Sequence, residues 1–302
     1  MNTLSRAAVG AAILFTLLTT GPAAQQPAQG PAPGAPGQTP APPGRGGGMG
    51  NRFAGQPRIN ALIVSGGCCH DYPGEAKILM DAVNRVLPVD WTAVVQGGSG
   101  TRGSMPVYAD ADWANGFDIV VHNECLADVD DPAYIRRITA AHRSGPPAIV
   151  IHCAMHSYRA ATFDDWREFL GVTSRRHTKA FNIPVKIVAA DHAAMAGFKA
   201  DWITPVDELY VIEKIWPNTT ALASAVSPED KKEYPLIWAS EYVGKTRVFG
   251  TTLGHGADTW ADPVFQDPPT YRRRARAWSR THASFRRIRS PRSTGTPSCP
   301  RG

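Results

Sequence analysis

The chain has 302 residues, of which 43% are hydrophobic, and its formal net charge is +6. The charge does not indicate a nucleic-acid-binding domain, because residues 269–302 contain ten arginines and no Asp, Glu or Lys. Subtracting those ten charges leaves −4 for residues 1–268, so the basic character belongs to the end of the chain. We therefore expect no nucleic-acid partner.

The first 24 residues have the pattern of a secretory signal peptide, with Arg6, a short apolar run and small residues at 21–24. The run is shorter than the ~20 residues that a membrane span needs, although a retained anchor is the alternative interpretation. Residues 25–57 are rich in Pro, Gly, Ala and Gln and predict a disordered linker. We expect a periplasmic or secreted protein with no stable membrane span after cleavage of the signal.

Residues 58–267 have a length that suits one α/β domain. Strands are expected over 59–65, 91–96, 117–122 and 148–151, and helices over 75–87, 132–143 and 162–170, with Thr162 as a cap. This alternation predicts a mainly parallel sheet. Further strands are expected over 185–189, 209–212, 220–225, 236–242 and 247–252. We expect this second half to extend the sheet and to cover its crevice.

Reactive side chains follow four of the expected strands. In chain order they are His70, Glu124, His152, Cys153, His156, Arg159 and His255. The carboxyl ends of parallel strands meet at one edge of a sheet, where ligands bind. We therefore expect these groups to converge there, although no single motif among them is strong.

A divalent metal such as zinc could bind at this edge. The candidate ligands are His70, Glu124, His152 and His255. The alternative is that these side chains only form hydrogen bonds within a polar crevice. His152 and His156 are four residues apart, as in zinc proteases, but Cys153 stands where those enzymes have Glu. We therefore do not expect a zinc protease.

The five cysteines could form disulfides in an exported protein, but the sequence does not give their pairing. We expect no bridge between the neighbours Cys68 and Cys69, because the geometry of such a bridge is strained. Cys153 could be a nucleophile, with His152 or His255 as its base and Glu124 as the orienting group. Against this, a cysteine at a buried strand end is more often an inert packed residue.

Several motifs resemble those of the trehalose-utilisation, or ThuA-like, proteins. They are VSGG at 64–67 with His70, AIVIH at 148–152, DH at 191–192, DELY at 207–210 and RVFGTTLGH at 247–255. The resemblance implies the fold of class I glutamine amidotransferases, a flavodoxin-like three-layer sandwich with a mainly parallel central sheet. It does not imply glutaminase activity, because His152 stands where those enzymes have the catalytic Cys.

The resemblance also implies a role in sugar metabolism, and His152, His255 and Glu208 match family positions. We expect a protein that acts on or binds a carbohydrate, such as a trehalose-like disaccharide or a keto-sugar. If it is a hydrolase or isomerase, we expect His/Glu general acid–base chemistry. The expected catalytic residues are His152, His255, Glu124 and His156, and the expected substrate-binding residues are His70, Arg159, Glu208 and Trp260. A non-catalytic sugar-binding module and a metal-dependent hydrolase are the alternatives.

The resemblance ends near residue 267. Residues 268–302 are rich in Arg, Ser and Pro and predict a disordered tail, whereas ThuA-like proteins continue with an apolar helix. We take a frame-shifted reading of the gene as the hypothesis for this tail.

Overall fold

The computed structural model describes residues 53–266. The predicted signal peptide, nearly all of the predicted linker, the Arg-rich tail and Cys299 lie outside the described residues. No helix among residues 53–266 is long and apolar enough to cross a bilayer.

One eight-stranded sheet forms the centre of the domain. In order across the sheet its strands are β2 (Val89–Gln96), β1 (Ile59–Gly67), β3 (Ile119–Cys125), β4 (Ala148–Ile151), β12 (Thr246–Thr251), β11 (Glu233–Tyr242), β10 (Thr219–Val226) and β7 (Lys186–Ile187). The first five strands are parallel, and the last three pair in antiparallel fashion. The predicted α/β class with a mainly parallel sheet is confirmed, and the second half of the chain does extend the sheet.

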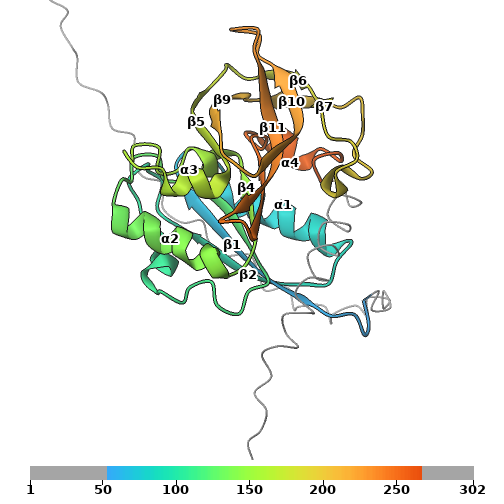
Figure 1. The fold of residues 1–302 in the computed structure, drawn as a ribbon. Coiled ribbons are helices and arrows are strands. Elements are labelled where there is room, and N and C mark those ends of the chain that lie inside the picture. The colour runs from blue at the N-terminus through green and yellow to red at the C-terminus, as the bar shows by residue number, and fades with distance from the viewer. Residues whose placement is uncertain (1–52, 267–302) are drawn as a thin grey trace, which may run out of the picture. The chain divides into compact units, whose positions relative to one another are not determined.

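Helices cover both faces of this sheet, which gives three layers (Figure 1). One face carries α1 (Tyr72–Asn84) and α4 (Ala257–Ala261), and the other carries α2 (Pro132–Ser144) and α3 (Asp165–Leu170). Local sequence sets where they start. The Asp131 side chain caps α2 by accepting the N–H of Ala133, and Pro132 has no N–H and so needs no acceptor there. The predicted cap Thr162 is wrong, because α3 begins after Asp164.

The two apolar layers follow from the alternation of side chains along each strand. Leu62 and Val64 of β1 belong to the core on the α2 and α3 side, whereas Ala61 and Ile63 pack with the apolar side chains of α1. Residues of β1 are therefore buried on both faces, as is typical of a central parallel strand.

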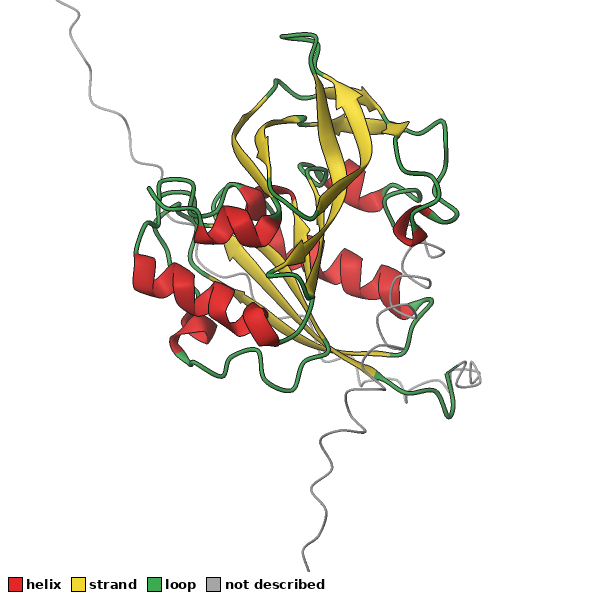
Figure 2. Ribbon diagram, viewed as in Figure 1, coloured by secondary structure: helices red, strands yellow, loops and turns green. Residues whose placement is uncertain are grey.

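Two small antiparallel sheets lie beside the antiparallel half of the central sheet, and Figure 2 shows this strand-rich end of the domain. They pair β5 (Val172–His177) with β9 (Tyr210–Ile215), and β6 (Phe181–Pro184) with β8 (Ile203–Asp207). We did not predict β5, β6 or β8, nor the short helices η1 (Pro106–Ala109), η2 (His152–Met155) and η3 (Ala193–Met195). These elements are too short, and too mixed in polarity, for a periodic pattern to mark them.

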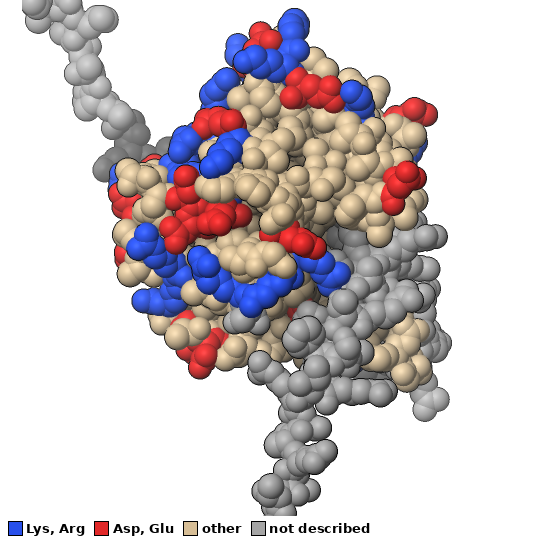
Figure 3. Space-filling view, in the orientation of Figure 1, with Lys and Arg blue, Asp and Glu red and all other residues tan. Residues whose placement is uncertain are grey.

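Charged side chains of both signs lie side by side on the face drawn in Figure 3. A separate apolar groove lies over β4, β12 and β11, on the same side of the sheet as α1. Its lining includes Ile149, Ile151, Ile237, Phe249 and Val264.

Candidate functional site

Three histidines from distant parts of the chain meet at the carboxyl edge of the parallel strands. His70 follows β1, His152 follows β4 directly, and His255 follows β12. The ring centroids lie 4.9 Å apart for His70 and His152, 5.4 Å for His70 and His255, and 5.5 Å for His152 and His255. One ring nitrogen of each lies within 4.8 Å of the others. The structure therefore brings these three predicted residues together, and we call them the imidazole cluster.

The main chain turns sharply where two of these histidines leave their strands. Gly67 at the end of β1 has φ +97, and a Cβ there would clash with the carbonyl oxygen of Cys125 on β3. His152 has φ 45, in the left-handed region that L side chains other than Asn, Asp and His rarely adopt. Backbone strain of this kind costs on the order of 1–3 kcal/mol and is common at functional sites.

Hydrogen bonds to carbonyl oxygens fix the tautomers of two imidazoles. His152 Nδ1 lies 2.6 Å from the Thr252 oxygen, and His70 Nδ1 lies 3.1 Å from the His255 oxygen. A carbonyl oxygen only accepts, so each Nδ1 carries a proton and each Nε2 of the neutral ring keeps its lone pair. Burial lowers the pKa of His70 and lowers that of His152 further, and neighbouring imidazoles add to both effects. Both rings are therefore neutral near pH 7.

Glu208 lies beside the imidazole cluster, just before β9. Its Oε2 is 3.5 Å from His255 Nδ1 and 3.8 Å from His152 Nε2, and its Oε1 is 3.3 Å from His177 Nδ1. Burial raises the pKa of Glu208, and the attraction of His177 and His255 opposes that rise. The Glu208 side chain is 13% exposed, whereas that of His255 is 41% exposed, so the site opens to solvent on the His255 side.

A second carboxyl group approaches the cluster from α1. Glu75 Oε1 lies 3.8 Å from His70 Nδ1, and Glu75 Oε2 accepts a hydrogen bond of 2.9 Å from the Asn123 amide. Burial raises the pKa of Glu75 to about 7. Near neutral pH this carboxyl group can therefore both hold and release a proton. No sequence pattern indicated this role for Glu75, because Glu is common in the first turn of helices.

Glu124, predicted as a catalytic residue and a metal ligand, lies in the interior on the other face of β3. Its Oε1 accepts a hydrogen bond of 2.8 Å from the Tyr108 hydroxyl and lies 3.0 Å from His122 Nδ1. His122 in turn lies 3.0 Å from His142, and none of these side chains is exposed. No hydrogen bond or ion pair within residues 53–266 joins Glu124 to the imidazole cluster. The structure thus gives Glu124 a place in a buried polar network, away from the candidate site.

His156 is separated from the imidazole cluster by Tyr210. Its ring stacks on Tyr210 at 3.9 Å between centroids, and its Nε2 lies 3.0 Å from the Ser174 hydroxyl. Burial, with smaller contributions from Arg159 and His177, lowers the pKa of His156 to about 3. The Tyr210 hydroxyl lies 3.4 Å from His152 Nε2, so Tyr210 joins His156 to the cluster, and the charge of a protonated His156 also lowers the pKa of His152.

The two remaining predicted residues do not reach the imidazoles. Arg159 is exposed, and its guanidinium donates to the carbonyl oxygen of Arg175 at 3.3 Å. Trp260 is 1% exposed and donates its indole N–H to the Gly254 carbonyl oxygen at 2.8 Å. Trp260 therefore supports the loop that carries His255 and presents no open face for a sugar to stack on.

The four cysteines among residues 53–266 form two disulfides, Cys68–Cys69 and Cys125–Cys153. The expectation that Cys68 and Cys69 do not bridge is wrong. The main chain turns sharply at this point, with Cys69 at φ 87, and this turn accommodates the bond between neighbours. Cys153 is bonded to Cys125 and has no free thiol in this state, so it offers no nucleophile beside His152.

The site also contains residues that sequence reasoning missed or left without a role. They are Glu75, Asn123, His177, Asp207 and Tyr210. Asp207 and Tyr210 flank Glu208 in the DELY motif, which was the one signal that could have identified them.

Comparisons with known proteins agree with this architecture. A profile of the trehalose utilisation family, ThuA, matches residues 80–269. A ThuA-like protein from Parabacteroides merdae ATCC 43184 superimposes with a TM-score of 0.56 at 19% identity, covering 74% of this chain and 91% of that one. A ThuA-like protein from Bacteroides uniformis ATCC 8492 gives 0.56 at 14% identity, covering 75% and 95%. No curated protein sequence matches the chain. The family profile spans more than half of the sequence, and the chain belongs to the trehalose utilisation (ThuA) family.

Proposed function

We propose that this protein binds a carbohydrate at the imidazole cluster and acts on it by general acid–base catalysis. One observation carries the proposal: Nε2 of neutral His152 lies 3.8 Å from the carboxyl group of Glu208, and the neutral ring of His70 lies against that of His152. The Nε2 lone pair of a neutral imidazole accepts hydrogen bonds from sugar hydroxyls. A carboxyl group with a raised pKa can deliver a proton and take it back.

The roles divide according to exposure. His255 and Glu208 form the side that opens to solvent, so they are the groups that exchange protons with the substrate. His70 and His152 are nearly buried and fixed by carbonyl oxygens, so they orient the hydroxyl groups. Glu75 supplies a further proton near pH 7 behind His70.

The substrate class rests on family membership, which supports a carbohydrate-related role. Within that class we propose a trehalose-like disaccharide or a keto-sugar. We also propose that the protein is exported, because its N-terminus has the pattern of a signal peptide and its described cysteines are paired as disulfides.

The test is a panel of disaccharides and keto-sugars, screened by thermal shift and by chromatography of products. We expect His152→Ala and His255→Ala each to lower turnover by about 10²-fold or more. His192→Ala is the matched control and should leave turnover unchanged, because half-buried His192 accepts the N–H of Ala194 in η3 and lies outside the imidazole cluster. Unchanged turnover in both cluster variants would reject the catalytic proposal. Binding without turnover across the whole panel would instead favour a sugar-binding module.

The cluster favours a second candidate, a metal-dependent hydrolase. Three imidazoles with one nitrogen each within 4.8 Å match the protein ligands of a catalytic zinc site. The carbonyl oxygens that hold Nδ1 of His70 and His152 are typical partners of metal-binding histidines. Glu208, rather than the predicted Glu124, lies close enough to assist.

Elemental analysis of the purified protein, with turnover measured before and after chelation, separates the two candidates. A metal-dependent hydrolase should contain about one equivalent of zinc or a similar ion and lose activity on chelation. In that case His70→Ala should weaken zinc binding in calorimetry, and His192→Ala should not. Full activity after complete removal of metal would reject this second candidate.

A further inference from the structure

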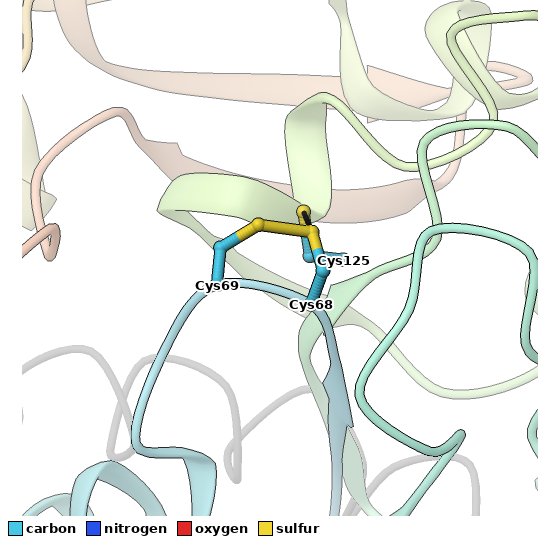
Figure 4. A group of neighbouring side chains, drawn as sticks. All are labelled: Cys68, Cys69 and Cys125. Carbon is cyan, nitrogen blue, oxygen red and sulfur yellow. Dashed lines mark hydrogen bonds between the residues drawn. A yellow bond between two sulfur atoms is a disulfide. The ribbon is translucent and has the colours of Figure 1, made fainter. Parts of the chain in front are cut away.

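Four cysteines gather at the ends of β1, β3 and β4, beneath the imidazole cluster. Cys68 and Cys69 form one disulfide, and Cys125 and Cys153 form the other. Figure 4 shows three of these side chains converging, and the Sγ atoms of Cys68 and Cys125 lie only 3.6 Å apart. Two disulfides in contact through one sulfur of each can exchange partners, provided that one of them is first opened to a thiolate.

Solvent exposure differs sharply among the four cysteine residues. Cys68, Cys125 and Cys153 are 8%, 2% and 8% exposed, whereas Cys69 is exposed. A thiol from outside the protein can therefore approach the group through Cys69. We call Cys68–Cys69 the outer disulfide and Cys125–Cys153 the inner disulfide. The contact between Cys68 and Cys125 lets a thiolate formed in the outer disulfide reach the inner one.

We propose that this group is a thiol–disulfide exchange site that passes reduction from an external thiol to Cys153. An external thiolate attacks Cys69 Sγ, forms a mixed disulfide there and releases the Cys68 thiolate. The Cys68 thiolate attacks Cys125 Sγ, so a Cys68–Cys125 bond forms, the Cys125–Cys153 bond breaks, and the Cys153 thiolate takes up a proton. A second external thiol frees Cys69 and leaves as the external disulfide.

The two electrons come from the two external thiols. The protein starts with two disulfides and ends with one, Cys68–Cys125, together with free thiols at Cys69 and Cys153. The attacking and leaving sulfurs of the internal step are already neighbours, so this step needs no large movement of the chain.

The exchange changes how two site histidines are held. Cys69 immediately precedes His70, and Cys153 immediately follows His152. Before exchange the inner disulfide links the end of β3 to η2. After exchange the Cys68–Cys125 disulfide links the end of β1 to the end of β3 instead. A thiol then stands next to His152. This inference does not depend on the proposed carbohydrate chemistry.

The test starts from Cys299→Ser, which leaves only the four described cysteines. It compares two variants of this protein, in each of which one further cysteine is replaced by serine. In Cys69→Ser, Cys68 is a free thiol beside Cys125 from the start, and exchange should proceed without any reductant. In Cys68→Ser, the free thiol is Cys69, whose Sγ lies within 4.8 Å of Cys125 Sγ but does not make the 3.6 Å contact that Cys68 makes, so the Cys125–Cys153 bond should persist. Acid quenching, labelling with N-ethylmaleimide in denaturant and peptide mass mapping identify the free thiols. We expect labelled Cys153 in Cys69→Ser and none in Cys68→Ser.

The chain with all four cysteines gives a second measurement, which does not depend on how a variant folds. After treatment with one equivalent of dithiothreitol, peptide maps should show the Cys68–Cys125 linkage with label on Cys69 and Cys153. If Cys68 alone is labelled in Cys69→Ser, and dithiothreitol yields only labelled Cys68 and Cys69, the proposal is overturned. Isolation of the native protein with a metal ion and four free thiols would overturn it as well.

Discussion

Asp207 accepts a hydrogen bond from the main-chain N–H of His255, whose nitrogen lies 3.3 Å from Asp207 Oδ1. The other oxygen of the carboxylate accepts the N–H of Gly254 at 3.0 Å. Asp207 is fully buried, and this contact holds the end of β8 against a loop that lies 48 residues further along the chain. The position of the His255 imidazole therefore depends on a buried carboxylate that holds the main chain of His255.

Replacing Asp207 with Ala should destabilise the domain and misplace His255. The change leaves the buried N–H of Gly254 without its acceptor, which typically costs about 1–3 kcal/mol. Urea unfolding measures the loss, and turnover should fall more than His192→Ala lowers it. Asp201→Ala, at an exposed position, is the control and should change the free energy of unfolding by less than about 0.5 kcal/mol.

Glu208→Gln should abolish most turnover while keeping the fold. The amide has nearly the shape of the carboxyl group but cannot exchange a proton, so we expect a loss of about 10²-fold or more in kcat. Glu213→Gln is the matched control, since Glu213 lies on β9, close to Glu208 in the sequence, but pairs with Arg175 at the surface. If both variants keep full kcat on a substrate that the native protein turns over, Glu208 transfers no proton in the rate-limiting step.

Gly67→Ala should be strongly destabilising. The main chain at Gly67 has φ +97, and an added Cβ would clash with the Cys125 carbonyl oxygen, so β1 and β3 would have to separate. We expect a loss of several kcal/mol, or failure to fold. Gly100→Ala is the control, because a Cβ there meets no atom within 4 Å. Thermal melting of both proteins distinguishes a local clash from a general intolerance of Ala.

Acid should destabilise the native protein less once His156 is removed. Burial holds the pKa of folded His156 at about 3, whereas an unfolded histidine titrates near 6.5. Between these values the unfolded state binds the extra proton, so stability falls as pH drops. Between pH 7 and pH 5 this one group contributes a loss of about 2 kcal/mol. His156→Gln should reduce the pH 7 to pH 5 difference in urea unfolding by about that amount.

Glu75 contributes to the pH dependence of the free energy of unfolding with the sign opposite to that of His156, so it provides a check on that prediction. Its folded pKa of about 7 lies above the unfolded value of 4.5, so the folded state holds the extra proton between these values. Its contribution is present at low pH and is lost as pH rises through 7. Glu75→Gln should therefore steepen the loss of stability on acidification, whereas His156→Gln makes it shallower. If the loss of stability on acidification changed in the same direction in both variants, these assignments would be contradicted.

The sequence predicted the convergence of His70, His152 and His255 because the rule behind it is topological. Strands of a parallel sheet end at one edge, so residues just after β1, β4 and β12 must meet there. The same reasoning misplaced Glu124. We ended the strand at residue 122, but β3 runs to Cys125, so Glu124 shares the inward-facing side of the strand with His122.

Other features had no local signal to read. The left-handed backbone of His152 and the disulfide between Cys68 and Cys69 depend on packing around the turns, and no periodic sequence pattern predicts either of them. Glu208 was predicted as a carboxylate at the start of a strand and from the family motif, without its partners. Its contacts with His152, His177 and His255 come from three separate segments that the small sheets bring together.

The place of β12 has a consequence for biosynthesis. It is the last strand of the described residues, yet it lies in the middle of the central sheet, between β4 and β11. Until it emerges from the ribosome, the parallel and antiparallel halves have no partner strand between them. The nascent chain therefore carries two open sheet edges, and it closes them only when the segment that brings His255 arrives. The imidazole cluster and the finished sheet are completed in the same step, so a chain that ends before β12 lacks His255 and keeps two open sheet edges, which favour aggregation.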